Sequence, residues 1–222
     1  MGIYQIYPKK RKSFFSNFSL TANLILINLL CFIVLSFLIS SKTVSIDSVA
    51  IKPSNIFQGE YLWTFLTSMF MHGGFFHIFA NMFSLFFIGS LVEKILGAKR
   101  YLWFYLSSGI FASLFFVLMS LVWTADFDAY AVGASGALFG LIGLLVLLTP
   151  NLSVYLMFIP IPIKMKYAAP GILIVLWLIS IAGSVPIGNT AHLGGLICGL
   201  IYGIYLRRKY PKKVQMLNRF FK

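Results

Sequence analysis

Long runs of apolar residues without a charged side chain dominate the sequence. The first run, residues 20–40, would be about 32 Å long as an α-helix at about 1.5 Å per residue, enough to cross a hydrocarbon core of roughly 30 Å. Similar runs follow at residues 75–92, 101–122, 134–149, 168–183 and 191–206. This pattern predicts an all-α membrane protein with six transmembrane helices.

The connection between the first two runs, residues 43–74, is long for a loop. Its part 56–71 is rich in aromatic and apolar residues, yet polar residues such as Glu60 interrupt it. We therefore expect an interfacial first loop that lies in the outer membrane surface, with Tyr61 and Trp63 at the level of the lipid headgroups.

Composition and charge agree with a bilayer protein. Hydrophobic residues make up 59% of the chain and charged residues 10%, which excludes a water-soluble domain with a polar exterior. The net charge of +13 does not indicate nucleic acid, because 16 of the 18 Lys and Arg residues fall on the side of the membrane that holds both ends of the chain. The positive-inside rule makes that side cytoplasmic. The expected organisation is a basic cytoplasmic segment (1–19), a six-helix domain (20–206) and a basic cytoplasmic tail (207–222).

Neither a disulfide framework nor a metal site can be read from the sequence. Cys31 and Cys198 both fall inside apolar runs. His72 and His77 are five residues apart, which is not the spacing of one helix face, and Glu93 is about 24 Å from His77 along a helix. We expect no metal and no other cofactor.

Four polar residues lie at similar depth in the predicted helices. His77 and Asn81 share a face of the second helix, Ser135 starts the fourth, and His192 opens the sixth. Counting from the cytoplasmic ends places all four at about 20 to 26 Å, in a layer roughly 5 to 10 Å below the outer surface. Water must then reach this layer through a cavity open to the exterior.

These residue types suit acyl transfer. A serine hydroxyl becomes a nucleophile when a nearby base takes its proton, and imidazole is the usual base near neutral pH. Ser135 and His192 could form such a pair. Asn81, His77 and a backbone N–H at the start of the fourth helix are suitable donors to the oxyanion that follows.

Glycines supply a reason for the two residues to meet. Gly195, Gly199 and Gly203 form one stripe with His192 on the sixth helix, and the fourth helix carries a second stripe. Small residues at this spacing let two backbones approach closely, which would bring Ser135 and His192 within reach of each other.

Each residue also has a structural explanation. Ser135 could cap a helix, His192 could be a satisfied packing residue, and Asn81 could join helices by hydrogen bonds. Their shared depth favours a functional site over these separate explanations.

With these motifs the sequence resembles the rhomboid family of intramembrane serine proteases. The resemblance is carried by His72-x4-His77-x3-Asn81, by Gly133-Ala134-Ser135-Gly136, and by Ala191-His192-Leu193-Gly194-Gly195 with Gly199. It implies a six-helix rhomboid-like core that cleaves single-span transmembrane proteins within the lipid bilayer. By this resemblance Ser135 is the nucleophile, His192 the general base, His77 and Asn81 line the oxyanion hole, and Gly133 permits the turn before the serine.

Two positions depart from the family pattern. Many members have Trp-Arg in the first loop, whereas Thr64 follows Trp63 here, so a polar anchor of the loop is expected to be missing. Phe139 occupies the position where an aromatic residue, often Tyr, packs beside the base, so the ring is kept and its hydroxyl is lost.

Two other classes remain open. A non-proteolytic rhomboid-like protein would bind membrane helices with the same core. A small transporter would use His77, Asn81 and His192 as a polar path, but the helices show no two-fold internal similarity. The short termini favour a prokaryotic plasma membrane.

Overall fold

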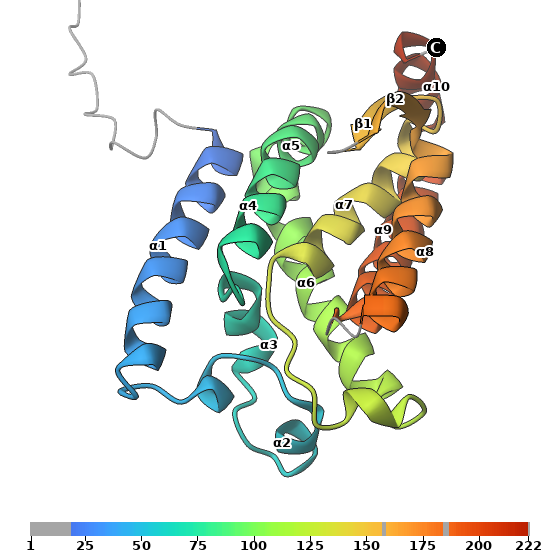
Figure 1. Cartoon of the computed structure of the whole chain (residues 1–222). Coiled ribbons are helices and arrows are strands. Elements are labelled where there is room, and N and C mark those ends of the chain that lie inside the picture. Colours follow the sequence, from blue (N-terminus) through green and yellow to red (C-terminus); the bar gives the residue numbers. More distant parts are fainter. Residues whose placement is uncertain (1–18, 157–158, 184–186, 222) are drawn as a thin grey trace, which may run out of the picture.

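A computed structural model describes residues 19–156, 159–183 and 187–221 as a bundle of helices (Figure 1). The predicted N-terminal segment 1–19 lies outside the described residues except for Ser19. The long helices are α1 (Leu20–Ser40), α4 (Phe75–Ser84), α5 (Ser90–Leu96), α6 (Ala98–Met119), α7 (Ser135–Leu148), α8 (Met165–Gly183), α9 (Asn189–Lys209) and α10 (Pro211–Phe220). A π-helical turn, η4 (Leu85–Gly89), makes α4, η4 and α5 one continuous helix.

Each of the six predicted apolar runs overlaps a helix. Among the described residues, four helices are long and apolar enough to cross a membrane: α1, the continuous α4–η4–α5, α6 and α8. Helix α7 has 14 residues and is therefore only about 21 Å long. Helix α9 begins with polar residues and ends in Arg207, Arg208 and Lys209, which lowers its apolar character.

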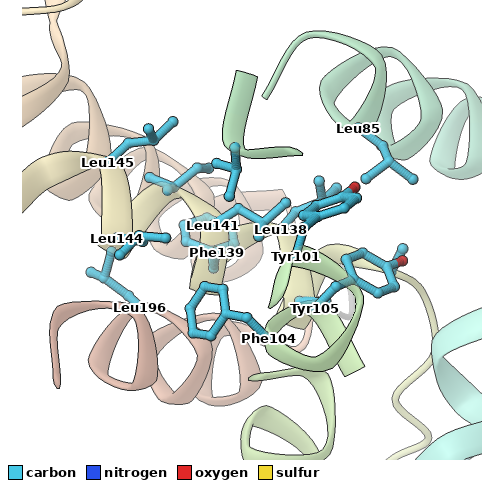
Figure 2. Close-up of a cluster of buried hydrophobic side chains, with 14 of the residues drawn as sticks. Leu85, Tyr101, Phe104, Tyr105, Leu138, Phe139, Leu141, Leu144, Leu145 and Leu196 are labelled. Atoms are coloured by element: carbon cyan, nitrogen blue, oxygen red, sulfur yellow. The ribbon is translucent and has the colours of Figure 1, made fainter. Parts of the chain in front are cut away.

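Helix α7 lies at the centre of the bundle and is buried along most of its length. It packs against α9, α6 and α8. Figure 2 shows leucines of α7 and Phe139 meeting Tyr101, Phe104 and Tyr105 of α6 and Leu196 of α9. A helix surrounded by protein does not need to span the full hydrocarbon core, because its ends are covered by other elements.

The contact between α7 and α9 is a contact of main chains. A Cβ atom added to Gly199 would meet the carbonyl oxygen of Gly140 and lie 2.7 Å from the amide nitrogen of Leu144. One added to Gly195 would meet the carbonyl oxygen of Gly136. The predicted close approach of the two glycine stripes is therefore confirmed.

The first turn of α1 is held by a carboxylate from α5. Glu93 accepts hydrogen bonds from the backbone N–H groups of Leu20 (2.8 Å) and Thr21 (2.9 Å) and from the Thr21 hydroxyl (2.7 Å). These N–H groups have no partner within the helix, and the negative charge suits the positive end of the helix dipole. The buried residues of α1, Thr21, Leu24 and Asn28, all lie in its half nearest this cap.

The prediction of an all-α chain is wrong in one place. Strands β1 (Ser153–Leu156) and β2 (Ile159–Lys164) form an antiparallel hairpin between α7 and α8, with Val154 opposite Ile163. The β-branched residues of β2 favour an extended strand. Pro160 and Pro162 are tolerated, because a two-stranded sheet leaves alternate N–H positions of each strand unpaired.

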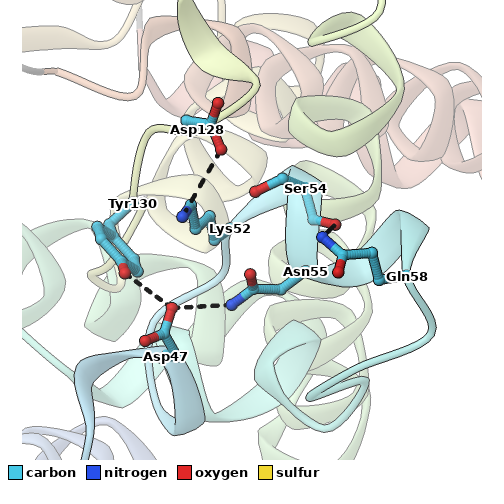
Figure 3. A network of polar contacts seen from close by, with 7 residues as sticks. All are labelled: Asp47, Lys52, Ser54, Asn55, Gln58, Asp128 and Tyr130. Atoms are coloured by element: carbon cyan, nitrogen blue, oxygen red, sulfur yellow. Dashed lines mark hydrogen bonds and ion pairs between the residues drawn. The ribbon is translucent and has the colours of Figure 1, made fainter.

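The first loop is folded, with short helices α2 (Pro53–Phe57) and α3 (Thr64–Thr67). The Trp63 indole N–H donates to the carbonyl of Ser48 (2.8 Å). Thr64 is fully buried, and its hydroxyl donates to the carbonyl of Tyr61 (2.7 Å). Polar contacts of Asp47 and Lys52 also fasten the loop (Figure 3), so the loop has polar anchors although Thr64 stands where many family members have Arg. The anchors come from residues that the sequence motif does not include.

The predicted tail 207–222 is also largely structured. Helix α9 continues to Lys209, and α10 follows after Tyr210. Val214 of α10 is buried against the core, which fastens this basic segment to the end of the bundle.

We expect Gly199→Ala to destabilise the protein by about 1–3 kcal/mol, because the added methyl group has no space between the two main chains. Unfolding by SDS titration in mild detergent micelles measures the effect. Gly171→Ala in α8 is the matched control: no atom lies within 4 Å of the added carbon, so the helix should gain about 0.5–1 kcal/mol. Equal effects of the two substitutions would contradict the packing argument.

Candidate active site

The structure brings Ser135 and His192 together. The Ser135 hydroxyl oxygen lies 2.8 Å from Nε2 of His192, across 57 positions of sequence. Ser135 is the first residue of α7, and His192 lies in the first turn of α9. The glycine contact between these helices sets the short distance, because it joins them immediately below both residues.

His192 is held by an aromatic ring. Phe139, one turn after Ser135, stacks on the imidazole with ring centroids 4.6 Å apart and an interplanar angle of 17°. His192 itself is only 6% exposed. The predicted aromatic contact beside the base is confirmed, and it rests on the ring alone.

Among the described residues, no carboxylate bonds to the other nitrogen of His192. In the described part of the chain, Nδ1 is buried and has no hydrogen-bond partner. An imidazole that accepts the Ser135 proton at Nε2 carries its own proton on Nδ1. Among the described residues, the contacts of this imidazole are therefore the Ser135 hydroxyl at Nε2 and the stacked ring of Phe139.

Gly133 makes the turn that precedes Ser135. Its φ of +111° lies in the region that side chains disfavour. A Cβ atom there would also lie 2.7 Å from Nε2 of His77, so the position has no space for a side chain. The backbone N–H of Gly133 donates to the carbonyl of Ser68 (2.8 Å), which fixes the turn against the first loop.

His77 and Asn81 lie on the α4 side of this turn. His77 faces Gly133, and its Nδ1 accepts a weak hydrogen bond from the N–H of Gly73 (3.4 Å). Asn81 is 5% exposed and donates one amide hydrogen to the carbonyl of His77 (2.8 Å). Its second amide hydrogen is left for another acceptor.

Sequence reasoning missed the contact that His72 makes in the site. This residue is 2% exposed, its ring packs edge-on against His77 at 5.2 Å, and its Nε2 accepts the backbone N–H of Ala134 (3.4 Å). His72 thus holds the residue between Gly133 and Ser135. Only its place in the histidine motif could have indicated this role.

A second missed contact joins the loop before α7 to the start of α9. Asp126 accepts a hydrogen bond from the Thr190 hydroxyl (2.7 Å), two residues before His192. Burial raises the pKa of the Asp126 carboxyl, and the bond from Thr190 partly offsets this rise. A carboxylate at the positive end of α9 also suits the helix dipole.

Across the described residues, no three His, Cys, Asp or Glu side chains gather in a way that could hold a metal ion.

Comparison with known proteins gives the family. The family model described as Rhomboid domain matches residues 59–209, about two thirds of the chain. RHOMBOID-like protein 1 of Arabidopsis thaliana is 38% identical over 157 residues, covering 69% of this chain and 37% of the relative. Rhomboid-like protease 1 of Toxoplasma gondii is 32% identical over 162 residues, covering 72% and 52%. Inactive RHOMBOID-like protein 8 of Arabidopsis thaliana is 35% identical over 143 residues, covering 63% and 37%.

The chain belongs to the rhomboid family, and it is an integral membrane protein of that family. It spans about a third to a half of the length of these curated relatives. The matched residues contain Ser135, His192, His77, Asn81 and Gly133, whereas α1 precedes them.

Proposed function

We propose that this protein is an intramembrane serine endopeptidase that hydrolyses peptide bonds in the outer part of transmembrane segments. The observation that carries the proposal is the 2.8 Å distance between the Ser135 hydroxyl and His192 Nε2 at the N-terminal ends of two packed helices. A serine at this distance from an unprotonated imidazole nitrogen is arranged for nucleophilic attack.

The reaction would proceed in two halves. Ser135 Oγ attacks the carbonyl carbon of the substrate while His192 takes the hydroxyl proton, and this proton then passes to the leaving amine as the C–N bond breaks. Water next attacks the acyl ester, with His192 again accepting a proton, and the carboxylic acid leaves as Ser135 regains its hydrogen. His192 acts first as base and then as acid in each half.

The oxyanion of each tetrahedral intermediate needs donors that are already in place. We assign this role to the spare amide hydrogen of Asn81, to His77 beside the Gly133 turn, and to a backbone N–H at the start of α7. Because the Gly133 turn is fixed by Ser68 and the next residue by His72, these donors would not need to reorganise during the reaction.

We propose a topology in which six helices cross the bilayer and both ends of the chain are cytoplasmic. The support is the distribution of charge, with Lys99, Arg100 and the α9–α10 junction on one side and Asp47, Asp126 and Asp128 on the other. The prokaryotic plasma membrane stays a prediction from the sequence, and the plant and Toxoplasma relatives do not support it.

The main alternative is a rhomboid-like protein that binds membrane helices without cutting them. The relative named as inactive, 35% identical, shows that homology alone does not decide between the two. The Ser135–His192 contact favours the enzyme, and the first prediction below separates the two classes.

We expect Ser135→Ala and His192→Ala each to abolish cleavage of a single-span substrate in liposomes, and the double variant to be no worse than either, because the two residues act as one unit. Asn81→Ala should slow cleavage by at most about 10²- to 10³-fold, since other oxyanion donors remain. Full activity in either of the first two variants, with folding confirmed by thermal unfolding, would exclude the Ser–His mechanism.

The topology predicts a difference in cysteine labelling. In a background without Cys31 and Cys198, Asp128→Cys should react with an impermeant thiol reagent from outside the cell and Lys99→Cys should not. Both side chains are exposed, so accessibility within the protein does not explain a difference. The reversed pattern would overturn the proposed orientation.

The depth of the site predicts which substrates are cut. The backbone hydrogen bonds of a transmembrane helix shield its peptide bonds, so a few residues must unwind before a bond can be cut. Unwinding costs least near water, where the freed backbone groups find hydrogen-bond partners. We expect cleavage at a small residue in the outer third of the span, with a Gly or Pro nearby on its C-terminal side, because these lower helix stability by about 1 and about 3 kcal/mol relative to Ala. Replacing that residue by Leu should slow cleavage severalfold. Equal rates and sites in both substrates would rule out unwinding as the basis of selection.

A further inference from the structure

The first loop is fastened to the segment that leads into the Gly133 turn. We call the set of contacts between them the outer lock. It consists of Asp47, Ile51 and Ser54 on the loop and of Phe127, Tyr130 and Ala131 on the segment.

Backbone hydrogen bonds form one part of the outer lock. Ile51 and Ala131 pair as an isolated antiparallel bridge, with N–H to carbonyl distances of 3.1 and 2.9 Å. The N–H of Ser54 donates to the carbonyl of Phe127 (3.0 Å). Ile51 is only 1% exposed, so water does not compete for the bridge, and breaking it would leave buried polar groups unpaired.

A charged acceptor forms the second part. The Tyr130 hydroxyl donates to Oδ1 of Asp47 (2.7 Å), and the Asn55 amide donates to the same oxygen (2.9 Å), as Figure 3 shows. These two bonds, with Lys52 nearby, lower the pKa of the Asp47 carboxyl, which is therefore ionised at neutral pH. Hydrogen bonds to an ionised acceptor are stronger than neutral ones.

The outer lock also touches the start of α9. Ile51 packs with Phe116 and Val117 of α6 in a small second core, and both Ala131 and Ala191 pack against it. Ala131 lies four residues before Ser135, and Ala191 directly precedes His192. The same buried group therefore supports the segments that carry the nucleophile and the base.

The segment between Ala131 and Ser135 is neither helix nor strand, and its last residue, Ala134, joins α7 only through its carbonyl, which accepts the N–H of Leu138 (3.0 Å). Its far end is held by Ser68 and His72, and its near end by the outer lock. We infer that the outer lock acts together with the glycine contact of α7 and α9 in setting the position of Ser135 relative to His192, and that Tyr130 and Asp47 are positioning residues for the proposed reaction. This inference rests on the proposed function.

The test measures how fast the Ser135 hydroxyl reacts, separately from the binding of a protein substrate and from the stability of the fold. A small fluorophosphonate reacts at an activated serine, forming an O–P bond as fluoride leaves, and does not need the first loop to hold a protein substrate. We expect Tyr130→Phe to slow labelling of Ser135 by about fivefold, because small displacements of a nucleophile are costly. It should lower kcat for a single-span substrate by a similar factor and leave KM nearly unchanged.

Four further variants show whether the effect comes from the bond between Tyr130 and Asp47. Asp47→Asn should keep a nearly normal labelling rate, because its amide oxygen still accepts the Tyr130 hydrogen, whereas Asp47→Ala should label as slowly as Tyr130→Phe. The Asp47→Ala/Tyr130→Phe double variant should be no slower than the slower single variant, since both remove one shared interaction. Asp128→Asn is the matched control: it removes the exposed 3.6 Å ion pair with Lys52 but keeps the Tyr130–Asp47 bond, and because an exposed ion pair contributes little, this variant should label like the wild type.

The possible results differ clearly. If the wild type labels and Tyr130→Phe labels equally fast, the outer lock does not position the serine, whether or not the thermal midpoint falls. A rise in KM with normal labelling would overturn the inference in favour of substrate docking. Slow labelling of the Asp128→Asn variant would show that any disturbance of the loop slows the reaction of Ser135, and this would overturn the inference. If folded wild-type protein does not label at all, the proposed function itself fails.

Discussion

At the centre of the molecule two helices touch through their main chains. The glycines of α9 rest on carbonyl oxygens and amide nitrogens of α7, and no side chain separates the two helices there. This contact fixes the relative position of the two N-terminal ends, where Ser135 and His192 lie 2.8 Å apart. In lipid there is little hydrophobic gain from bringing helices together, so close van der Waals contact of this kind is what holds them. The distance between Ser135 and His192 thus depends on glycines that pack about one and two turns further along α9.

The sequence indicated this centre because it is periodic. Apolar runs of sufficient length predict membrane helices, and every predicted run overlaps a helix of the structure. The glycine stripes repeat with the helical period, so the contact of α7 with α9 could be predicted from spacing alone. Ser135 and His192 then stood at the ends of the two stripes, and the ring of Phe139 stood one turn from the serine. Helix boundaries were less predictable: α6 starts and ends three residues earlier than its apolar run, because Gly97 with positive φ separates it from α5.

The half of the molecule that holds the first loop gave no such signal. The bridge between Ile51 and Ala131, the bond between Asp126 and Thr190, and the contact of Asp47 with Tyr130 each join residues more than 60 positions apart. Such contacts have no period, and each depends on one or two residues whose types are common in any loop. The hairpin before α8 was missed for a related reason: two prolines in six residues suggest a turn, and they are compatible with a strand only because the sheet has two strands. The contacts that could be predicted from the sequence were those whose residues recur with the helical period.

The cap on α1 has a consequence for the order in which the protein assembles. Glu93 follows Leu20 by 73 positions in the chain, so α1 leaves the ribosome and enters the membrane long before its capping carboxylate exists. Until α5 arrives, the first N–H groups of α1 have only water or headgroups as partners, and its outer half never gains a large buried face. Helix α1 is therefore tethered at this end only after α5 has been made. The closing of one carboxylate on one helix end joins α1 to the helix formed by α4, η4 and α5.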